Sequence, residues 1–219
     1  MERSRVVKLI LNELDRLYPD ATCSLYHKDI YQLTIATILS AQCTDEVVNK
    51  VTPKLFEKYP DFSALALSDI DDIEQIIKPT GFYKNKAKNI QQLATIITDS
   101  YNGALTLNID ILTKLPGIGR KTANVILSEY AQPHGIVVDT HVKRITNRLG
   151  LTEHTDPNKI ERDLMKIILK DKWKLISHQL IQHGRKICNA KKPQCEKCTL
   201  NLYCKFYKTS EKVNPSRLR

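Results

Sequence analysis

The chain carries LPGIGRKTA at residues 115–123, and this stretch decides the prediction of the fold. A short apolar segment precedes it, and helical spacing of apolar side chains continues to residue 130. Gly117 and Gly119 suit a tight turn, because glycine adopts backbone conformations that other residues avoid. The stretch therefore predicts a helix-hairpin-helix, with an ordinary helix-helix turn as the alternative. Backbone N–H groups from Gly117 to Arg120 would then bind a phosphate oxygen without regard to base sequence.

Apolar residues recur at helical spacing along most of the chain, as at Val6, Ile10 and Leu14, and no strand alternation stands out. Start and stop signals for helices agree with this pattern. These signals are Ser68 with Asp71, Asn102-Gly103, Gly150 and Asp156-Pro157. Pro53 interrupts one apolar pattern, so we expect that helix to kink or to begin later. The sequence predicts an all-α protein of roughly ten short helices.

A boundary between two parts is expected near residues 131–135, where QPHG interrupts two helical segments. Charge is unevenly distributed: residues 172–219 contain twelve basic and two acidic residues, whereas residues 61–80 contain five acidic and one basic. Together with the net charge of +10, this distribution predicts a polyanionic partner. A role in solubility is the alternative, and we expect the last ten residues, 210–219, to form a solvated basic tail.

Four of the six cysteines lie within seventeen residues, spaced C-x6-C-x2-C-x5-C at Cys188, Cys195, Cys198 and Cys204. Their thiolates can surround one metal centre. The asymmetric spacing favours a 4Fe-4S cluster, whose corners are reached from different directions. Zinc is the alternative, although four-thiolate zinc sites usually use two C-x2-C pairs.

Lys191 and Lys192 lie between the first two of these cysteines, so a bound metal would fix a basic loop that can lie on a phosphate backbone. Cys23 and Cys43 stand apart and are expected to be small buried residues. Charges interrupt every apolar run near the N-terminus, so we expect no signal peptide and no membrane segment. Clustered thiols fit a reducing compartment, and we expect a cytoplasmic protein.

Lys121 and Asp139 are the candidate catalytic residues. Lys121 falls in the first turn of the helix after the hairpin, where the positive end of the helix dipole favours a neutral, nucleophilic amine. Asp139 falls at the expected start of another helix, whose N–H groups stabilise an ionised carboxylate. Such a charge could stabilise positive charge at an anomeric carbon or help activate the nucleophile. A solvated surface lysine and a plain N-cap are the alternatives.

The stretch at residues 115–123, VDTH at residues 138–141 and the four-cysteine spacing closely resemble the bacterial endonuclease III family. Further matching motifs are LSAQ at 39–42 followed by Thr44-Asp45, GFY at 81–83 before Lys86-Ala87, and HGR at 183–185. The resemblance spans nearly the whole chain, and the order and spacing of the motifs make it specific.

The resemblance implies a two-domain helix-hairpin-helix glycosylase fold. A six-helix barrel would occupy residues 23–133, an iron-sulfur cluster domain would combine residues 1–22 and 134–219, and the active site would lie in the cleft between them. The lysine matching Lys121 would attack C1′ of a damaged pyrimidine nucleotide flipped out of the duplex, form a Schiff base and cut the strand by β-elimination. Asp139 would assist the first step, and Gln42 would fill the gap left by the flipped base.

Two residues depart from the family pattern. The family often has a leucine that acts as a wedge at the position of Phe82, and a small residue at the position of Cys43. A larger ring at Phe82 can still insert between bases. The expected partner is double-stranded DNA with damaged bases or abasic sites, bound by a nucleoid-associated monomer. A monofunctional mismatch glycosylase of the same superfamily is one alternative, but its members lack the lysine. A non-catalytic, metal-containing DNA-binding module is the other.

Overall fold

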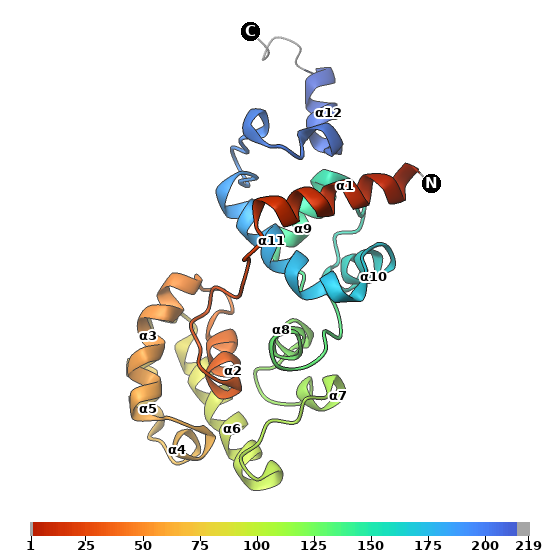
Figure 1. Cartoon of the computed structure of the whole chain (residues 1–219). Coiled ribbons are helices and arrows are strands. Elements are labelled where there is room, and N and C mark those ends of the chain that lie inside the picture. The colour runs from red at the N-terminus through yellow and green to blue at the C-terminus, as the bar shows by residue number, and fades with distance from the viewer. Residues whose placement is uncertain (1, 214–219) are drawn as a thin grey trace. The chain divides into compact units, whose positions relative to one another are not determined.

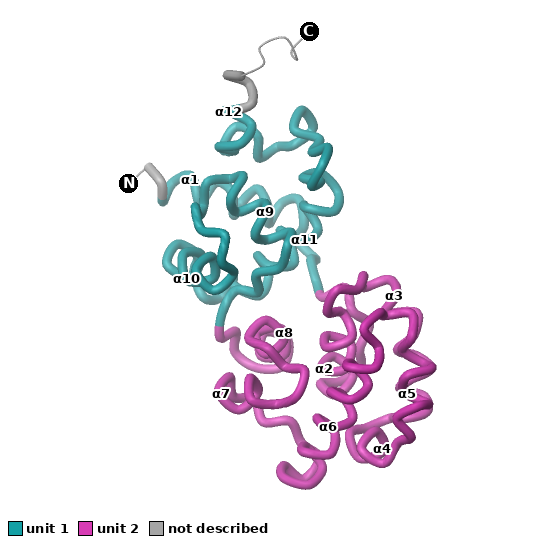
Figure 2. The backbone as a smooth tube through the Cα atoms, turned by 180° about the vertical axis from the view of Figure 1, so that it is seen from behind, with its two compact units in different colours: residues 1–22, 135–219 teal, residues 23–134 magenta. Residues whose placement is uncertain are grey.

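Figure 1 shows the computed structural model of the chain, which describes residues 2–213. Every regular element in that range is helical, so the all-α prediction is confirmed. The chain forms two compact units: unit 1 comprises residues 1–22 and 135–219, and unit 2 comprises residues 23–134 (Figure 2). Unit 1 is therefore discontinuous in sequence. The basic tail expected at residues 210–219 lies outside the described side chains.

Unit 2 is a set of helices packed around one apolar core. Its elements are α2 (Ile30–Leu39), α3 (Asp45–Lys58), α4 (Phe62–Ala66), α5 (Ile70–Ile77), the 3-10 helix η1 (Lys78–Thr80), α6 (Tyr83–Tyr101), α7 (Ile109–Leu112) and α8 (Arg120–Tyr130). Helix α6 packs against α4 and α5, and α2 packs against α8. Helix α2 is the central element because it has no charged residue and eight of its ten residues are buried.

Unit 1 has a separate apolar core. Its elements are α1 (Glu2–Leu17), α9 (Thr140–Leu149), α10 (Pro157–Ile167), η2 (Lys170–Lys172), α11 (Trp173–Lys186), η3 (Cys195–Lys197), η4 (Asn201–Tyr203) and α12 (Lys205–Val213). Helix α11 packs against α1 and α9. Lys172 Nζ and Gln179 Nε2 each donate a hydrogen bond of 2.9 Å to the carboxylate of Asp15. These bonds join α1 to elements that come much later in the sequence.

Several predicted helix ends are confirmed. The Asp156 side chain accepts a hydrogen bond of 2.9 Å from the backbone N–H of Lys159, and Pro157 occupies the first turn of α10. Gly150 ends α9 and Asn102 ends α6, both in the left-handed conformation. These ends depend on local chemistry, which explains why the sequence indicates them.

One expected cap is wrong, and of the kink or later start expected from Pro53, the later start is wrong. Asp69, not Ser68, caps α5, because its side chain accepts from the backbone N–H of Asp71 at 3.0 Å. Ser68 Oγ instead donates to the Leu65 carbonyl at 2.6 Å. Helix α3 does not begin after Pro53 but runs through it from Asp45 to Lys58. A proline removes one N–H donor there, and the buried apolar face of the helix compensates.

Cys23 and Cys43 were expected to be buried, but both are only partly buried. Each packs against the rim of the unit 2 core instead of lying inside it. Their sulfur atoms therefore contribute less to the core than the sequence suggested.

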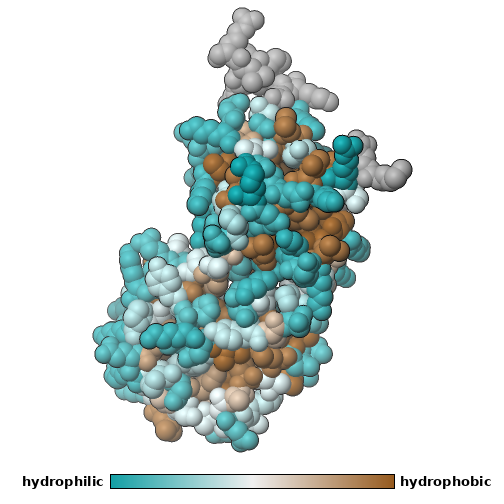
Figure 3. Space-filling model, viewed as in Figure 1, coloured by the Kyte–Doolittle hydropathy of each residue, from teal (hydrophilic) through white to brown (hydrophobic). Residues whose placement is uncertain are grey.

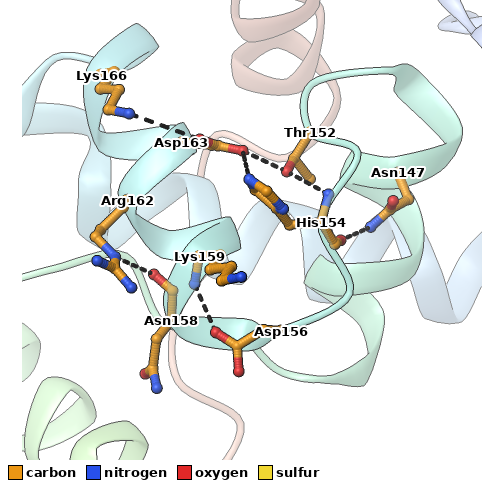
Figure 4. A network of polar contacts seen from close by, with 9 residues as sticks. All are labelled: Asn147, Thr152, His154, Asp156, Asn158, Lys159, Arg162, Asp163 and Lys166. Carbon is orange, nitrogen blue, oxygen red and sulfur yellow. Dashed lines mark hydrogen bonds and ion pairs between the residues drawn. The ribbon is translucent and has the colours of Figure 1, made fainter.

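A polar network holds the loop between α9 and α10 (Figure 4). Thr152 Oγ1 donates to Asp163 Oδ2 at 2.7 Å, and His154 Nε2 lies 3.8 Å from the same oxygen. Asn147 Nδ2 donates to the His154 carbonyl at 3.1 Å. Because these groups come from both helices and the loop, the network joins the middle of α10 to the end of α9.

The surface seen in Figure 3 is largely hydrophilic, with smaller apolar areas between the polar residues. This mixture is ordinary for a folded chain in water. None of the helices within residues 2–213 has both the length and the apolar character that crossing a membrane requires.

Candidate functional site

The hairpin joins α7 to α8 as the sequence predicted. Leu115 and Ile118 are buried in the unit 2 core, and the Ile118 N–H donates to the Leu115 carbonyl at 3.1 Å. Gly117 has a φ of +75°, a left-handed conformation that disfavours residues with a Cβ. A Cβ there would lie 3.2 Å from Ile38 Cγ2 and from Asn89 Cβ. Gly117 is therefore required both by the turn and by the packing of the turn against α2 and α6.

Gly119 serves a different purpose from Gly117. Its φ of −84° and ψ of 175° are extended values that any residue adopts, so the expected need for an unusual conformation is wrong here. Among the residues that the structure describes, a Cβ at Gly119 would meet no atom within 4 Å, and no side chain caps the start of α8. The start of α8 therefore presents backbone N–H groups on an open surface, an arrangement that suits an anionic oxygen.

Lys121 lies in the first turn of α8, next to Arg120, and both residues are exposed. The buried face of the same helix carries Ala123, Ile126 and Leu127. These apolar residues fix α8 in the core of unit 2, so the helix holds Lys121 at a defined place beside the open N–H groups. The amine is accessible to a ligand bound there.

Besides Asn102 at the end of α6, two exposed non-glycine residues of unit 2 have left-handed backbone conformations, Gln42 with a φ of +53° and Phe82 with a φ of +48°. This conformation costs a residue with a Cβ roughly 1–2 kcal/mol. Phe82 is also 64% exposed, so its ring is accessible to a ligand. Strain and exposure together are typical of functional loops, and both occur at residues singled out from the sequence.

Lys86 donates hydrogen bonds to the segments that precede Gln42 and Phe82 in the chain. The sequence did not assign it a role. It lies in the first turn of α6 and is only 5% exposed. Its Nζ donates to the Leu39 carbonyl at 2.8 Å and to the Thr80 carbonyl at 2.9 Å. Burial lowers the pKa of Lys86. A lysine at the start of an amphipathic helix usually extends into solvent, so the sequence pattern offered no signal for these contacts.

Asp139 is the N-cap of α9, as predicted. Its Oδ1 accepts a hydrogen bond of 2.8 Å from the backbone N–H of Val142, and the residue is partly buried. Val142 and Ile145 anchor α9 in the core of unit 1. The carboxylate is therefore held by the helix that it caps. Lys121 belongs to unit 2, whereas Asp139 belongs to unit 1.

The four clustered cysteines line one pocket of unit 1. The sulfur of Cys204 lies 3.3 Å from the Arg148 carbonyl, and that of Cys198 lies 3.6 Å from His183 Nε2. Burial raises the pKa of Cys198 to about 11 and also raises the pKa of Cys195 and Cys204, with a further contribution from the neighbouring thiolates. Four thiolates in this pocket therefore need a cation beside them.

The thiols are distributed over the wall of the pocket. Within residues 2–213, no three or more His, Cys, Asp or Glu side chains are arranged to hold a single metal ion. All four sequence-predicted cysteines nevertheless line the same pocket.

Two arginines of α9 hold the cysteine loop, and the sequence analysis missed them. Arg148 donates to Cys188 Sγ at 3.2 Å and to the Asn189 carbonyl at 2.8 Å. Arg144 donates to the Cys188 carbonyl at 3.0 Å and to the Gly184 carbonyl at 3.1 Å. Their spacing of four residues, which places both on one face of the helix, was the available signal.

Lys191 and Lys192 are exposed in the loop between Cys188 and Cys195. The base of this loop is closed by a hydrogen bond of 2.9 Å from the Gln194 N–H to the Ile187 carbonyl. The loop therefore presents two basic side chains from a closed backbone. Contact of these side chains with DNA stays a prediction.

Comparisons with known proteins find relatives over nearly the whole chain. The family model for HhH-GPD superfamily base excision DNA repair proteins matches residues 35–170. Endonuclease III of Synechocystis sp. is 50% identical over 204 residues, which cover 93% of each chain. Endonuclease III of Bacillus subtilis is 40% identical over 200 residues, which cover 91% of each chain. A solved structure of a trapped covalent endonuclease III–DNA intermediate is 44% identical, with a TM-score of 0.89 over 94% of this chain and 98% of that chain.

These likenesses extend over both units, and the predicted helix-hairpin-helix glycosylase fold is confirmed. The hairpin lies in unit 2 and the four cysteines in unit 1. The chain therefore belongs to the endonuclease III family, within the HhH-GPD superfamily of base excision DNA repair proteins.

Proposed function

We propose that this chain is a bifunctional base-excision repair enzyme, a DNA glycosylase that is also a lyase at abasic sites. Its substrate is duplex DNA with oxidised pyrimidines. The observation that carries the proposal is the open start of α8, where uncapped N–H groups lie beside the exposed amine of Lys121. Family membership supports it, because a solved endonuclease III relative was trapped as a covalent intermediate with DNA.

Lys121 is the nucleophile in this proposal. Its amine attacks C1′ of the damaged nucleotide, the glycosidic bond breaks, and the base leaves with the bonding electrons and takes up a proton. After the nitrogen loses a proton, its lone pair expels O4′ from C1′, O4′ takes up a proton, and a protonated Schiff base joins Lys121 to the opened sugar. Removal of a proton from C2′ then expels the 3′ phosphate oxygen, which cuts the strand by β-elimination. Asp139 stabilises the positive charge that develops at C1′ or helps to deprotonate the amine.

Binding to DNA is assigned to groups in both units. In unit 2, the backbone N–H groups of Gly117 and Gly119 bind a phosphate, and Gln42 and Phe82 occupy the space left by the flipped nucleotide. In unit 1, Lys191 and Lys192 approach the phosphate backbone. Backbone and lysine contacts of this kind position the duplex without reading its sequence.

A 4Fe-4S cluster is the proposed cofactor, held by Cys188, Cys195, Cys198 and Cys204. The donor set fits, because four thiols line one pocket and iron-sulfur clusters are held by four cysteine thiolates. When bound, the cluster would supply the positive charge that four buried thiolates require, and its role would be structural. Zinc remains the alternative and is distinguished by visible absorption, which a 4Fe-4S cluster has and zinc lacks.

Borohydride trapping tests the proposal, because reduction of the Schiff base leaves the protein joined to DNA. The wild type should form the joined product with duplex DNA that contains an abasic site. Lys121→Ala should lose it, whereas Lys88→Ala, a control that removes an exposed lysine of α6, should retain it. A Lys121→Ala protein that still traps DNA would remove the assignment of the nucleophile.

Asp139→Asn tests the charge of Asp139 apart from its role as a helix cap. Asparagine also caps helices but carries no charge. We expect base release from thymine glycol DNA to slow by roughly 10²–10⁴-fold while the fold is retained. A wild type that releases bases without trapping would instead indicate a monofunctional glycosylase. A wild type that binds DNA but releases no base would indicate a non-catalytic binding module.

A further inference from the structure

Lys86 is the only buried lysine among the residues whose exposure the structure describes, and the proposed chemistry gives it no task. Burying an ammonium is costly unless strong hydrogen bonds compensate. Here the compensation comes from two backbone carbonyls, Leu39 at 2.8 Å and Thr80 at 2.9 Å. These carbonyls belong to segments 41 residues apart in the chain, so the lysine joins two parts of unit 2 that have no local connection.

Each carbonyl lies close to a residue with a left-handed backbone. We call residues 40–44 the Gln42 loop and residues 80–83 the Phe82 loop. Leu39 is the last residue of α2, and Gln42 follows it by three positions with a φ of +53°. Thr80 is the last residue of η1, and Phe82 follows it by two positions with a φ of +48°. Two or three residues of chain span at most about 7–11 Å, so both strained residues stay close to the ammonium.

The ammonium suits this position for two physical reasons. The last carbonyls of α2 have no partner within the helix and carry the negative end of its dipole, so a cation there is stabilising. The backbone of Lys86 adds a third connection, because its N–H donates to the Phe82 carbonyl at 3.1 Å. One residue thus holds the end of α2, the end of η1 and the start of α6.

We propose that Lys86 is a positioning residue that sets the Gln42 loop and the Phe82 loop relative to each other, so that both side chains enter the DNA stack together. This inference rests on the proposed function. Lys86 does not touch the reacting atoms. It acts before chemistry, when a paired nucleotide has to leave the duplex and the space has to be filled.

The proposal predicts that loss of Lys86 affects two DNA substrates differently. A thymine glycol paired in a duplex needs both loops, whereas an abasic site in single-stranded DNA has no partner base and no gap to fill. Under single-turnover conditions, Lys86→Met should slow cleavage of the paired lesion by roughly tenfold to a hundredfold. Cleavage of the single-stranded abasic site should stay within about threefold of the wild type.

Lys88→Met is the matched control, because Lys88 is an exposed lysine on the same helix and its loss removes the same charge. It should stay within about threefold of the wild type on both substrates. A double variant, Lys86→Met with Phe82→Ala, tests whether Lys86 acts through the Phe82 loop. If it does, Phe82→Ala should slow cleavage of the paired lesion little beyond the slowing by Lys86→Met alone.

Hydrogen exchange gives a readout that needs no DNA. Lys86→Met should speed amide exchange at residues 40–44 and 80–83 and leave residues 115–119 unchanged. If Lys86→Met does not fold, Lys86→Gln, which keeps one neutral donor, should show the same pattern with a smaller effect.

Equal slowing on both substrates, or unchanged exchange at the two loops, would overturn the inference. A wild type that cleaves neither substrate would instead defeat the proposed function. The exchange measurement would then still test whether Lys86 holds the loops.

Discussion

The hairpin of unit 2 and the cysteine loop of unit 1 are both candidates for contact with DNA, yet they are built in different ways. The hairpin is fixed by its own backbone and by the buried side chains of Leu115 and Ile118. The cysteine loop contains only the short helices η3 and η4 and is held by Arg144, Arg148 and the thiols. Helix packing fixes the first region, and side-chain contacts fix the second.

This difference predicts which kind of change destabilises each region. The hairpin belongs to a core of packed helices and should respond to changes in van der Waals contact. The cysteine loop should respond to whatever its thiols bind, because few of its backbone groups have helical partners. Changes to one region should therefore leave the other largely intact.

The largest expected effect is loss of the proposed metal centre from unit 1. A structural metal can contribute on the order of 10 kcal/mol to folding, so Cys198→Ser should abolish visible absorption and the exchange protection of residues 187–204. Residues 35–130 of unit 2 should keep their protection. Cys23→Ser, a change of the same kind in unit 2, should retain the absorption. Persistent protection of the loop in Cys198→Ser would break the comparison.

Gly184→Ala should have the next largest effect. A Cβ at this residue of α11 would lie 2.6 Å from His141 Nδ1 and 2.9 Å from Ile145 Cδ1, both on α9. Overpacking of this kind costs about 1–3 kcal/mol, and it would also loosen the contact of Arg144 with the Gly184 carbonyl. Thermal unfolding should show a lower midpoint, with faster exchange in α9 and α11 but not in α6. An unchanged midpoint would show that the two helices separate easily.

The two hairpin glycines give a matched pair in unit 2. Gly117→Ala should lower the free energy of unfolding by about 1–2 kcal/mol, because alanine disfavours the left-handed conformation and meets Ile38 and Asn89. Gly119→Ala should change it by less than about 0.5 kcal/mol but weaken DNA binding, because a methyl group would crowd the open start of α8. Urea unfolding and a binding titration measure the two effects. Similar losses of stability would remove the distinction between the glycines.

The smallest expected effect concerns pH and unit 2. Hydrogen bonds from Lys58 at 2.7 Å and Tyr59 at 2.6 Å hold the pKa of Asp72 below its ordinary value of 3.8. A lowered pKa means that this stabilisation is present above pH 3.8 and is lost as the pH falls through the lowered value. Asp72→Asn should therefore cost about 0.2–1 kcal/mol at pH 7 and less in acid, measured by urea unfolding. Equal costs at both pH values would contradict the assignment.

Features that depend on neighbouring residues could be predicted from the sequence. The caps at Asp139 and Asp156, the turn at Gly117 and the cysteine spacing all follow from local chemistry. The error at Ser68 has the same origin, because serine and aspartate both cap helices and the two residues are adjacent.

Contacts between distant residues could not be predicted in this way. Lys86 reaches a carbonyl 47 residues earlier, and Arg148 reaches a sulfur 40 residues later. Nothing in the residues around either side chain specifies such a partner. The openness around Gly119 is likewise a property of the folded surface, since its own backbone conformation is ordinary.

The discontinuity of unit 1 has a consequence for synthesis of the chain. Helix α1 leaves the ribosome about 120 residues before α9, yet Val7, Ile10 and Leu14 belong to the core that α9 and α11 complete. Unit 2 lies wholly between them and can finish its own core first. For that interval the nascent protein carries an amphipathic helix without its partners, the kind of segment that chaperones bind.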